Sequence, residues 1–240
     1  MSQARIGIPA ITLTPGVASA QGSRWRTYTD IEPSVTVMIP QLPHRLLVVG
    51  AAAIETSELV QLIADLPADL PSPVVVAIHS LSRSQSATAM RLLTEQAKLR
   101  CAFASDGEPI ESGRVYVAPP ERHLIVERER LRVVFGPTEN RHRPALDPLF
   151  RTAAQAYGAS AIGVLLCGLA GEMSDGLFGL YHLGERGGIV VVPRRPGDSE
   201  PEGLNHASLF QRITVHHAPT RAELPPLLTR LATNVEGVTS

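Results

Sequence analysis

Residues 46–59 constrain the fold of this chain more than any other stretch. Four apolar residues, 46–49, run directly into Gly50 and three alanines, and a helical pattern begins at Thr56. A strand, a tight turn and a helix in succession form the repeating unit of an α/β protein. Ligands and nucleophiles gather at such turns, where the carboxyl end of the strand meets the positive amino end of the helix. We therefore expect the functional site at this turn.

The same turn lacks the residues that two common chemistries need. Ala52 and Ala53 stand where a hydrolase would place a hydroxyl group. Ile54 and Glu55 stand where a phosphate-binding loop would have glycines. The turn therefore has the position of an active site without its usual chemical groups.

Apolar runs of strand length alternate with helical patterns along the rest of the chain. Unbroken apolar segments, typical of strands buried in a parallel sheet, occupy residues 74–78, 162–166 and 188–192. Helical patterns are expected over residues 56–64, 85–99, 147–157 and 177–183. The predicted fold class is α/β, a Rossmann-like, doubly wound and mostly parallel sheet with helices on both faces.

Local signals refine this prediction in the middle of the chain. A small antiparallel ribbon is expected from three short strands at residues 114–117, 123–126 and 131–135. Asp147, followed by Pro148, is expected to cap the start of the next helix, and Gly158 to end that helix in a left-handed conformation.

Composition bounds the domain organisation and the partners. A chain of 240 residues, 44% of them hydrophobic, can bury one large core, so we expect one domain over residues 45–240. Residues 1–44, rich in Pro, Ser, Thr and Gly, are expected to form an arm or an added edge strand. A formal net charge of -1 gives no reason to expect a nucleic-acid partner.

The chain also lacks targeting and membrane signals. No apolar run approaches the roughly 20 residues of a membrane helix, and no signal peptide is present, so we expect no membrane insertion and a cytoplasmic protein. Cys101 and Cys167 lie in apolar surroundings and are expected to be buried free thiols, in keeping with that compartment. No cofactor is predicted, and the sequence leaves the oligomeric state open.

Several segments resemble one known family in order and spacing. They are GAAAIE at residues 50–55, VVVAIHS at 74–80, SDGEPIESGRVYVAPPERHLIV at 105–126, RHRPALDPLFRTAAQAYG at 141–158 and LCGLAGEMSDGLFGL at 166–180. These segments resemble the catalytic domain of the chemotaxis protein-glutamate methylesterases, the CheB family, over residues 45–231. In that family the first and last segments are GASTGG-like and LTGMGxDGxxG-like turns.

The resemblance implies positions for a catalytic triad. Family members resemble serine hydrolases, in which a serine attacks a glutamyl methyl ester of a chemoreceptor, a histidine takes its proton and an aspartate orients the histidine. The serine position falls on Ala52, the histidine on His79 and the aspartate on Asp175. An ungapped count from Cys167 would place the aspartate on Glu172, but the residues after Asp175 fit the family better.

A methyl group cannot attack an ester, so the resemblance implies a degenerate methylesterase-like domain. We predict a pseudoenzyme that binds a protein partner, a chemoreceptor or another chemosensory protein, in a bacterial signalling pathway. The alternative is an active esterase or deamidase in which His79 and Asp175 activate water, or in which Cys167 attacks. Many family members carry a receiver domain ahead of the catalytic one, and none is expected within residues 1–44.

Four of the polar residues near the expected site also have a structural interpretation. Thr56 and Ser57 fit helix capping better than the role of a replacement nucleophile. His79 fits both a catalytic imidazole and a ring packed at the end of a strand. Asp175 fits both a catalytic carboxylate and a cap of the helix that follows it.

Two other groups of residues leave a binding role open. His216 and His217, with His206 nearby, lack the spacing of a metal motif, so no metal site is predicted. Arg141 and Arg143 fit solvated surface charge or contact with an acidic partner.

Overall fold

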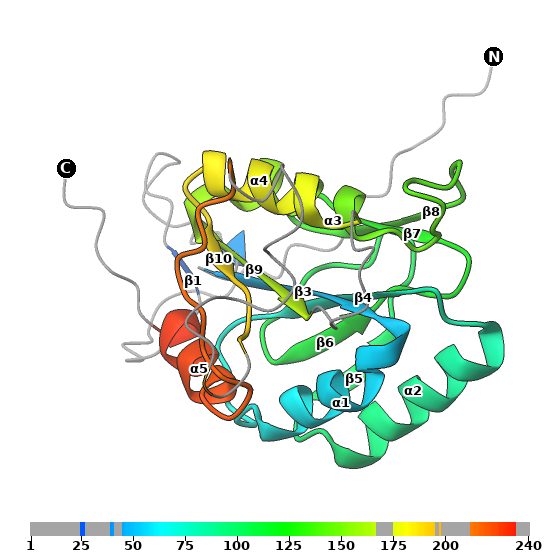
Figure 1. Cartoon of the computed structure of the whole chain (residues 1–240), viewed down its shortest axis with the longest axis horizontal. Coiled ribbons are helices and arrows are strands. Elements are labelled where there is room, and N and C mark those ends of the chain that lie inside the picture. The colour runs from blue at the N-terminus through cyan, green and yellow to red at the C-terminus, as the bar shows by residue number, and fades with distance from the viewer. Residues whose placement is uncertain are drawn as a thin grey trace, which may run out of the picture. The chain divides into compact units, whose positions relative to one another are not determined.

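The computed structural model describes residues 25–26, 39–40, 45–166, 175–194, 197 and 212–233 (Figure 1). The chain divides into two compact units, residues 1–42 and 43–240. In the first unit, strands β1 (Trp25–Arg26) and β2 (Ile39–Pro40) pair with each other in antiparallel register. The rest of the predicted N-terminal arm lies outside the described residues. No helix in the described part of the chain is long and apolar enough to span a bilayer.

The second unit is organised around one six-stranded sheet. Its order is β10-β9-β3-β4-β6-β5, and every neighbouring pair is parallel. The strands are β3 (Leu46–Ala52), β4 (Val74–His79), β5 (Arg100–Phe103), β6 (Arg114–Val117), β9 (Ala161–Leu166) and β10 (Ile189–Val191). Every residue of β4 and β9 is buried, because helices cover the sheet on both sides. The predicted fold class is confirmed.

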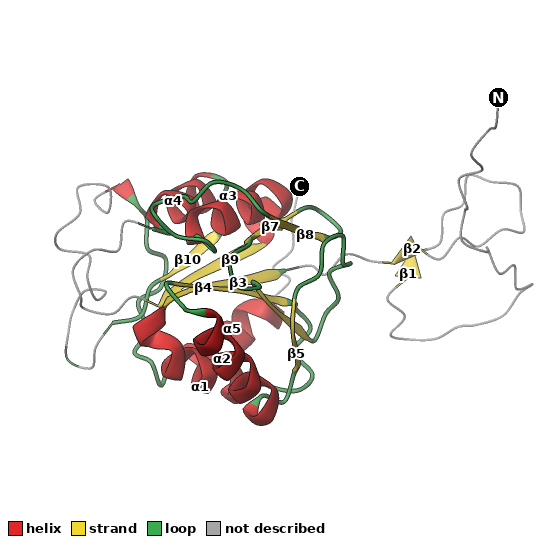
Figure 2. Ribbon diagram, turned by 90° about the vertical axis from the view of Figure 1, so that its right-hand side faces the viewer, coloured by secondary structure: helices red, strands yellow, loops and turns green. Residues whose placement is uncertain are grey.

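Two helical layers sandwich the sheet (Figure 2). One layer holds α1 (Thr56–Asp65), α2 (Arg83–Gln96) and α5 (Leu224–Thr233), and the other holds α3 (Leu146–Tyr157) and α4 (Leu177–Glu185). Short 3₁₀ turns, η1 (Ala53–Glu55) and η2 (Gly158–Ser160), follow β3 and α3. Side chains of β3 alternate between the layers: Leu47 and Val49 pack with α1, α2 and α5, and Leu46 and Val48 with α3 and α4.

The predicted three-stranded ribbon is wrong in one strand. Only β7 (His123–Val126) and β8 (Leu131–Val134) form the small antiparallel sheet. The third segment is β6, which pairs in parallel with β4 on one side and β5 on the other. Val115, Tyr116 and Val117 of β6 are buried, as expected for an inner strand. The sequence analysis did not predict β5, which is the edge strand of the sheet next to β6.

The start of α3 also differs from the prediction. The helix begins at Leu146, and its N-cap, Ala145, makes no side-chain hydrogen bond. Asp147 lies inside the first turn, and its Oδ1 accepts the backbone N–H of Gly179 in α4 at 2.7 Å. Asp147 therefore caps the neighbouring helix instead of its own. α3 ends at Gly158, as predicted, and this C-cap has a φ of 51°. Its ψ of -124° lies outside the left-handed helical region, so the expected left-handed conformation is wrong.

Candidate functional site

The candidate site lies at the carboxyl ends of β3 and β4. In the sheet, β4 lies on one side of β3 and β9 on the other, so the chain returns to the opposite edge of β3. Open α/β sheets bind ligands at such a topological switch point. Ala52, the last residue of β3, lies in register with His79, the last residue of β4. Strand alternation directs both side chains toward the α3 and α4 layer.

The turn after β3 is fixed by a residue from the far end of the chain. Glu55 is buried, and its Oε2 accepts a hydrogen bond from Nη2 of Arg221 at 2.9 Å. Ile54, beside it, is 72% exposed. A family-like glycine at position 55 would remove this ion pair, so Glu55 now has a structural role in the turn.

The predicted capping role of Thr56 and Ser57 is wrong. The N-cap of α1 is Glu55, which makes no side-chain cap hydrogen bond. The Thr56 hydroxyl donates instead to the carbonyl of Ala53 at 2.7 Å, and Ser57 is exposed in the first turn. The Thr56 hydroxyl thus stabilises the 3₁₀ turn η1.

His79 is a buried imidazole that makes no hydrogen bond to any described residue. It is 5% exposed, and neither ring nitrogen has a partner among the described residues. Its Nδ1 lies 3.7 Å from Oδ2 of Asp175, and its ring meets that of His142 edge to face with 4.2 Å between centroids. Burial lowers the pKa of His79, His142 lowers it further, and Asp175 opposes this shift. The ring is therefore neutral at neutral pH, the form that can accept a proton.

Asp175 is held at the amino end of α3. Its Oδ2 accepts the N–H of Leu146 at 2.8 Å, and its Oδ1 accepts the N–H of Asp147 at 3.1 Å. The side-chain amide of Asn140 donates to the same Oδ1 at 3.0 Å. The expectation that Asp175 caps the following helix is wrong, because the N-cap of α4 is Gly176 and the Asp175 carboxylate caps α3.

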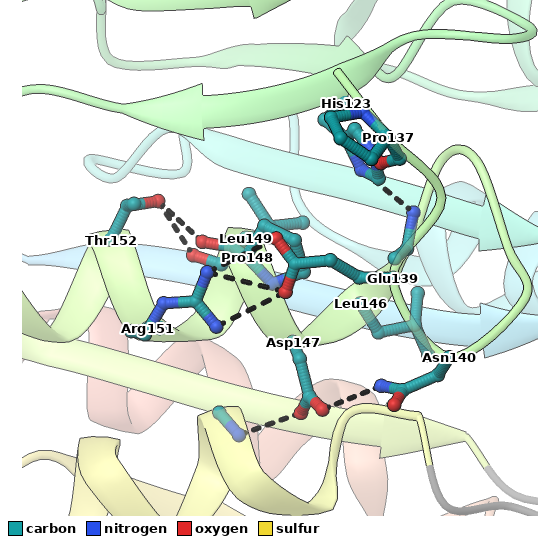
Figure 3. A network of polar contacts seen from close by, with 12 residues as sticks. His123, Pro137, Glu139, Asn140, Leu146, Asp147, Pro148, Leu149, Arg151 and Thr152 are labelled. Carbon is teal, nitrogen blue, oxygen red and sulfur yellow. Dashed lines mark hydrogen bonds and ion pairs between the residues drawn. The ribbon is translucent and has the colours of Figure 1, made fainter.

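The two aspartates exchange capping roles. Asp147, in the first turn of α3, caps α4, and Asp175, just before α4, caps α3. Asn140 bridges the two carboxylates, since its amide also donates to Oδ2 of Asp147 at 2.7 Å. Figure 3 shows the hydrogen bond between Asn140 and Asp147. Burial raises the pKa of Asp147, and the N–H of Gly179 and the Asn140 amide oppose that rise. The sequence analysis missed Asn140, whose role depends on a contact with a carboxylate 35 residues away.

A hydroxyl and imidazole pair beside His79 was also missed. Ser80 directly follows β4, is exposed, and has φ of 65°. Its Oγ lies 3.1 Å from Nδ1 of His142. The signal in the sequence was the serine-rich turn after residues 74–78, but the family resemblance placed the nucleophile position in the turn after β3.

The remaining candidates contribute no site that the structure describes. Cys167, Glu172 and His206 lie outside the described residues. Within the described ranges, no group of three or more His, Cys, Asp and Glu side chains is placed to hold a metal ion. Nδ1 of His216 accepts a backbone N–H at 3.1 Å. Cys101 is a free thiol but only half-buried, and burial raises its pKa to about 11.

The fold and the site together define an α/β domain with a histidine and a buried carboxylate at the switch point of a parallel sheet. A sequence model of the CheB methylesterase family matches residues 47–224. The chain belongs to the CheB methylesterase family.

Individual relatives agree with this assignment. The chain is 31% identical over 201 residues to a protein-glutamate methylesterase/protein-glutamine glutaminase of Bradyrhizobium diazoefficiens, covering 79% of this chain and 53% of that protein. It is 34% identical over 192 residues to a protein of the same description from Xanthomonas campestris, covering 78% and 49%. This chain thus spans about half the length of these relatives. The crystal structure of the Thermotoga maritima CheB methylesterase catalytic domain matches with a TM-score of 0.68 and 25% identity, covering 78% of this chain and 98% of that one.

Proposed function

We propose that this domain is a degenerate protein-glutamate methylesterase that acts by binding a protein partner in a bacterial chemosensory pathway. The observation that carries the proposal is Ala52, which ends β3 in register with His79. Members of the family need a serine at that position to attack the ester. Loss of such a nucleophile typically lowers turnover by on the order of 10⁶, leaving only binding and oxyanion stabilisation.

The two triad positions that remain do not compensate for the missing serine. Nδ1 of His79 and Oδ2 of Asp175 are 3.7 Å apart, beyond hydrogen-bond distance, and the carboxylate is already occupied by donors from α3 and Asn140. A water-activating histidine is normally oriented by such a hydrogen bond. This geometry favours a binding role over direct hydrolysis by His79.

A partly exposed cationic surface supports the binding role, in which Phe135 is exposed and Arg122 and Arg143 are half-buried. Phe135 is 66% exposed, and the guanidinium carbons of Arg143 and Arg122 lie 4.0 Å and 4.6 Å from its ring centroid. Both guanidinium groups interact electrostatically with the carboxylate of Glu121, which is hydrogen-bonded to Arg83. Arg143 also donates to the carbonyl of Gly136, and Arg122 to that of Glu121. We call Arg122, Phe135 and Arg143 the arginine–phenylalanine surface.

The chemistry of this surface fits an acidic segment of a partner protein. Arginine recognises carboxylates, and an exposed aromatic ring offers an apolar contact beside them. The sequence analysis left contact with an acidic partner open for Arg143, and the stacked position of that guanidinium favours it.

The first test of the proposal measures methanol release from methylated chemoreceptor by the wild-type chain. We expect no release above the uncatalysed rate, because no hydroxyl stands at position 52. His79→Ala is the matched variant and should give the same baseline. Methanol release that His79→Ala abolishes would overturn the proposal.

The second test measures binding of the full chain to a fluorescent acidic peptide with a central leucine. Arg122→Glu is expected to weaken binding at least tenfold, because it places a carboxylate against the acidic ligand. Arg128→Glu makes the same charge change at an exposed residue of the β7–β8 turn and serves as the control. Equal effects of the two variants would show that only net charge matters and would contradict a defined surface.

A further inference from the structure

We propose that Ser80 is a nucleophile for activated acyl groups and that His142 is its general base. This site goes beyond the binding function proposed above, because it makes no use of the vacant serine position at Ala52. It rests on the placement of Ser80, on the Ser80–His142 contact and on the packing of the buried His79 ring against His142.

Ser80 occupies a strained and exposed turn between a strand and a helix. It directly follows β4 with φ of 65°, a conformation that residues other than glycine adopt infrequently. Such strain is found at functional sites, and a strained strand-to-helix turn is how α/β hydrolases expose a nucleophile. The helix that follows has a fixed start, since Ser82 and Gln85 form a capping box at the N-terminus of α2.

Hydrogen bonds within and on either side of its turn hold His142 in place. The backbone groups of Glu139 and His142 exchange two hydrogen bonds, at 2.9 Å and 3.2 Å, which closes the turn that carries the ring. On either side of that turn, Nδ1 of His123 accepts the N–H of Ala145 at 3.3 Å, and its Nε2 donates to the carbonyl of Pro137 at 2.8 Å. These hydrogen bonds fix the segment that carries His142 and so keep its Nδ1 3.1 Å from Ser80 Oγ.

His79 contacts the ring of His142 and orients it. The rings of His79 and His142 are 4.2 Å apart between centroids, and Oδ2 of Asp175 lies 3.7 Å from Nδ1 of His79. This edge-to-face contact with a buried ring restricts rotation of the His142 imidazole. His79 is therefore a positioning residue of this pair.

The reaction follows from these contacts. Ser80 Oγ attacks the carbonyl carbon of an activated ester and forms a C–O bond while its proton moves to Nδ1 of His142. The tetrahedral intermediate collapses, the bond to the leaving alcohol breaks, and His142 returns the proton to that alcohol. Water then attacks the Ser80 ester, passes a proton to His142 and releases the carboxylic acid, with Ser80 recovering its proton.

The neighbouring serines provide internal controls for this assignment. Ser82 and Ser84 are also exposed, and their hydroxyl oxygens lie 3.1 Å from each other. Neither contacts an imidazole among the described residues. Ser84 thus matches Ser80 in exposure and residue type but lacks the base.

Labelling of the full chain with a fluorophosphonate, followed by peptide mass spectrometry, tests the proposal. We expect one adduct, on Ser80, which Ser80→Gly eliminates and Ser84→Ala leaves unchanged. Glycine is the replacement of choice because it adopts the φ of 65° without strain. His142→Gln, which keeps a hydrogen-bonding side chain but cannot take the proton, should slow labelling by about 10²- to 10⁴-fold.

Three outcomes would overturn the proposal: no adduct on the wild-type chain at saturating reagent, equal labelling of Ser80 and Ser84, or an unchanged rate in His142→Gln. Thermal unfolding of each variant shows whether a slower labelling rate is caused by misfolding. The methanol assay separates this proposal from the binding function. If the wild-type chain is not labelled, the nucleophile proposal fails but the binding function is unaffected. If the chain releases methanol and Ser80→Gly abolishes that release, the binding-only function fails and the role of Ser80 as a nucleophile is supported.

Discussion

Ala52→Ser is expected to give the chain measurable methylesterase activity. Residue 52 ends β3 in register with His79, and both side chains point to the layer that holds Asp175, so a hydroxyl there would be placed beside the imidazole. We expect methanol release from methylated chemoreceptor to rise by about 10²- to 10⁴-fold over the wild type. That is less than the roughly 10⁶ associated with a complete triad, because His79 and Asp175 are not hydrogen-bonded.

A second substitution should increase this gain. Ile54 is exposed in the turn after β3, where the family has a glycine, so methanol release by Ala52→Ser with Ile54→Gly is expected to exceed that by Ala52→Ser alone. Glu55 should be kept, although the family also has glycine there. Its ion pair with Arg221 joins η1 to the segment before α5, and Glu55→Gly is expected to lower the free energy of unfolding by about 2 kcal/mol.

The control for the rescue is Ala52→Ser combined with His79→Ala, which should return methanol release to the wild-type baseline. Circular dichroism establishes that each variant is folded. A folded Ala52→Ser, Ile54→Gly variant that releases no methanol would show that the site has lost more than its nucleophile.

Gly179→Ala is expected to destabilise the domain by about 3–5 kcal/mol. A Cβ at position 179 would lie 2.6 Å from Cβ of Phe150 and 2.8 Å from the backbone carbonyl oxygen of Asp147. Backbone atoms cannot rotate away, so α4 would have to separate from α3. That movement would also stretch the hydrogen bond from Gly179 N to Asp147 Oδ1, which is 2.7 Å long and buried.

Gly184→Ala is the matched control in the same helix. A Cβ there would meet only Cγ2 of Val190 at 3.7 Å, an ordinary van der Waals contact. Because alanine favours a helix over glycine by up to about 1 kcal/mol, this variant should be as stable as the wild type or slightly more stable. Urea unfolding of both variants measures the difference. A Gly179→Ala midpoint equal to that of Gly184→Ala would contradict the close packing of α4 on α3.

The sequence by itself determined the α/β class and much of the site at the end of the sheet. A strand whose residues are all apolar must be buried on both of its faces. This is typical of a parallel sheet covered by a helical layer on each side. The residues at the ends of β3 and β4 follow from that pattern, so Ala52 and His79 were expected at neighbouring positions. Family resemblance then supplied Asp175, which the fold brings to 3.7 Å from His79.

Only the tertiary structure decided which strands and side chains meet. Nothing within residues 114–117 specifies that β6 pairs between β4 and β5, because the partners of a parallel strand come from distant segments. The exchanged caps of Asp147 and Asp175 join groups 32 and 29 residues apart, and the Ser80–His142 pair joins residues 62 apart. Local sequence sets the conformation of each segment, but such contacts depend on how the packed layers bring segments together.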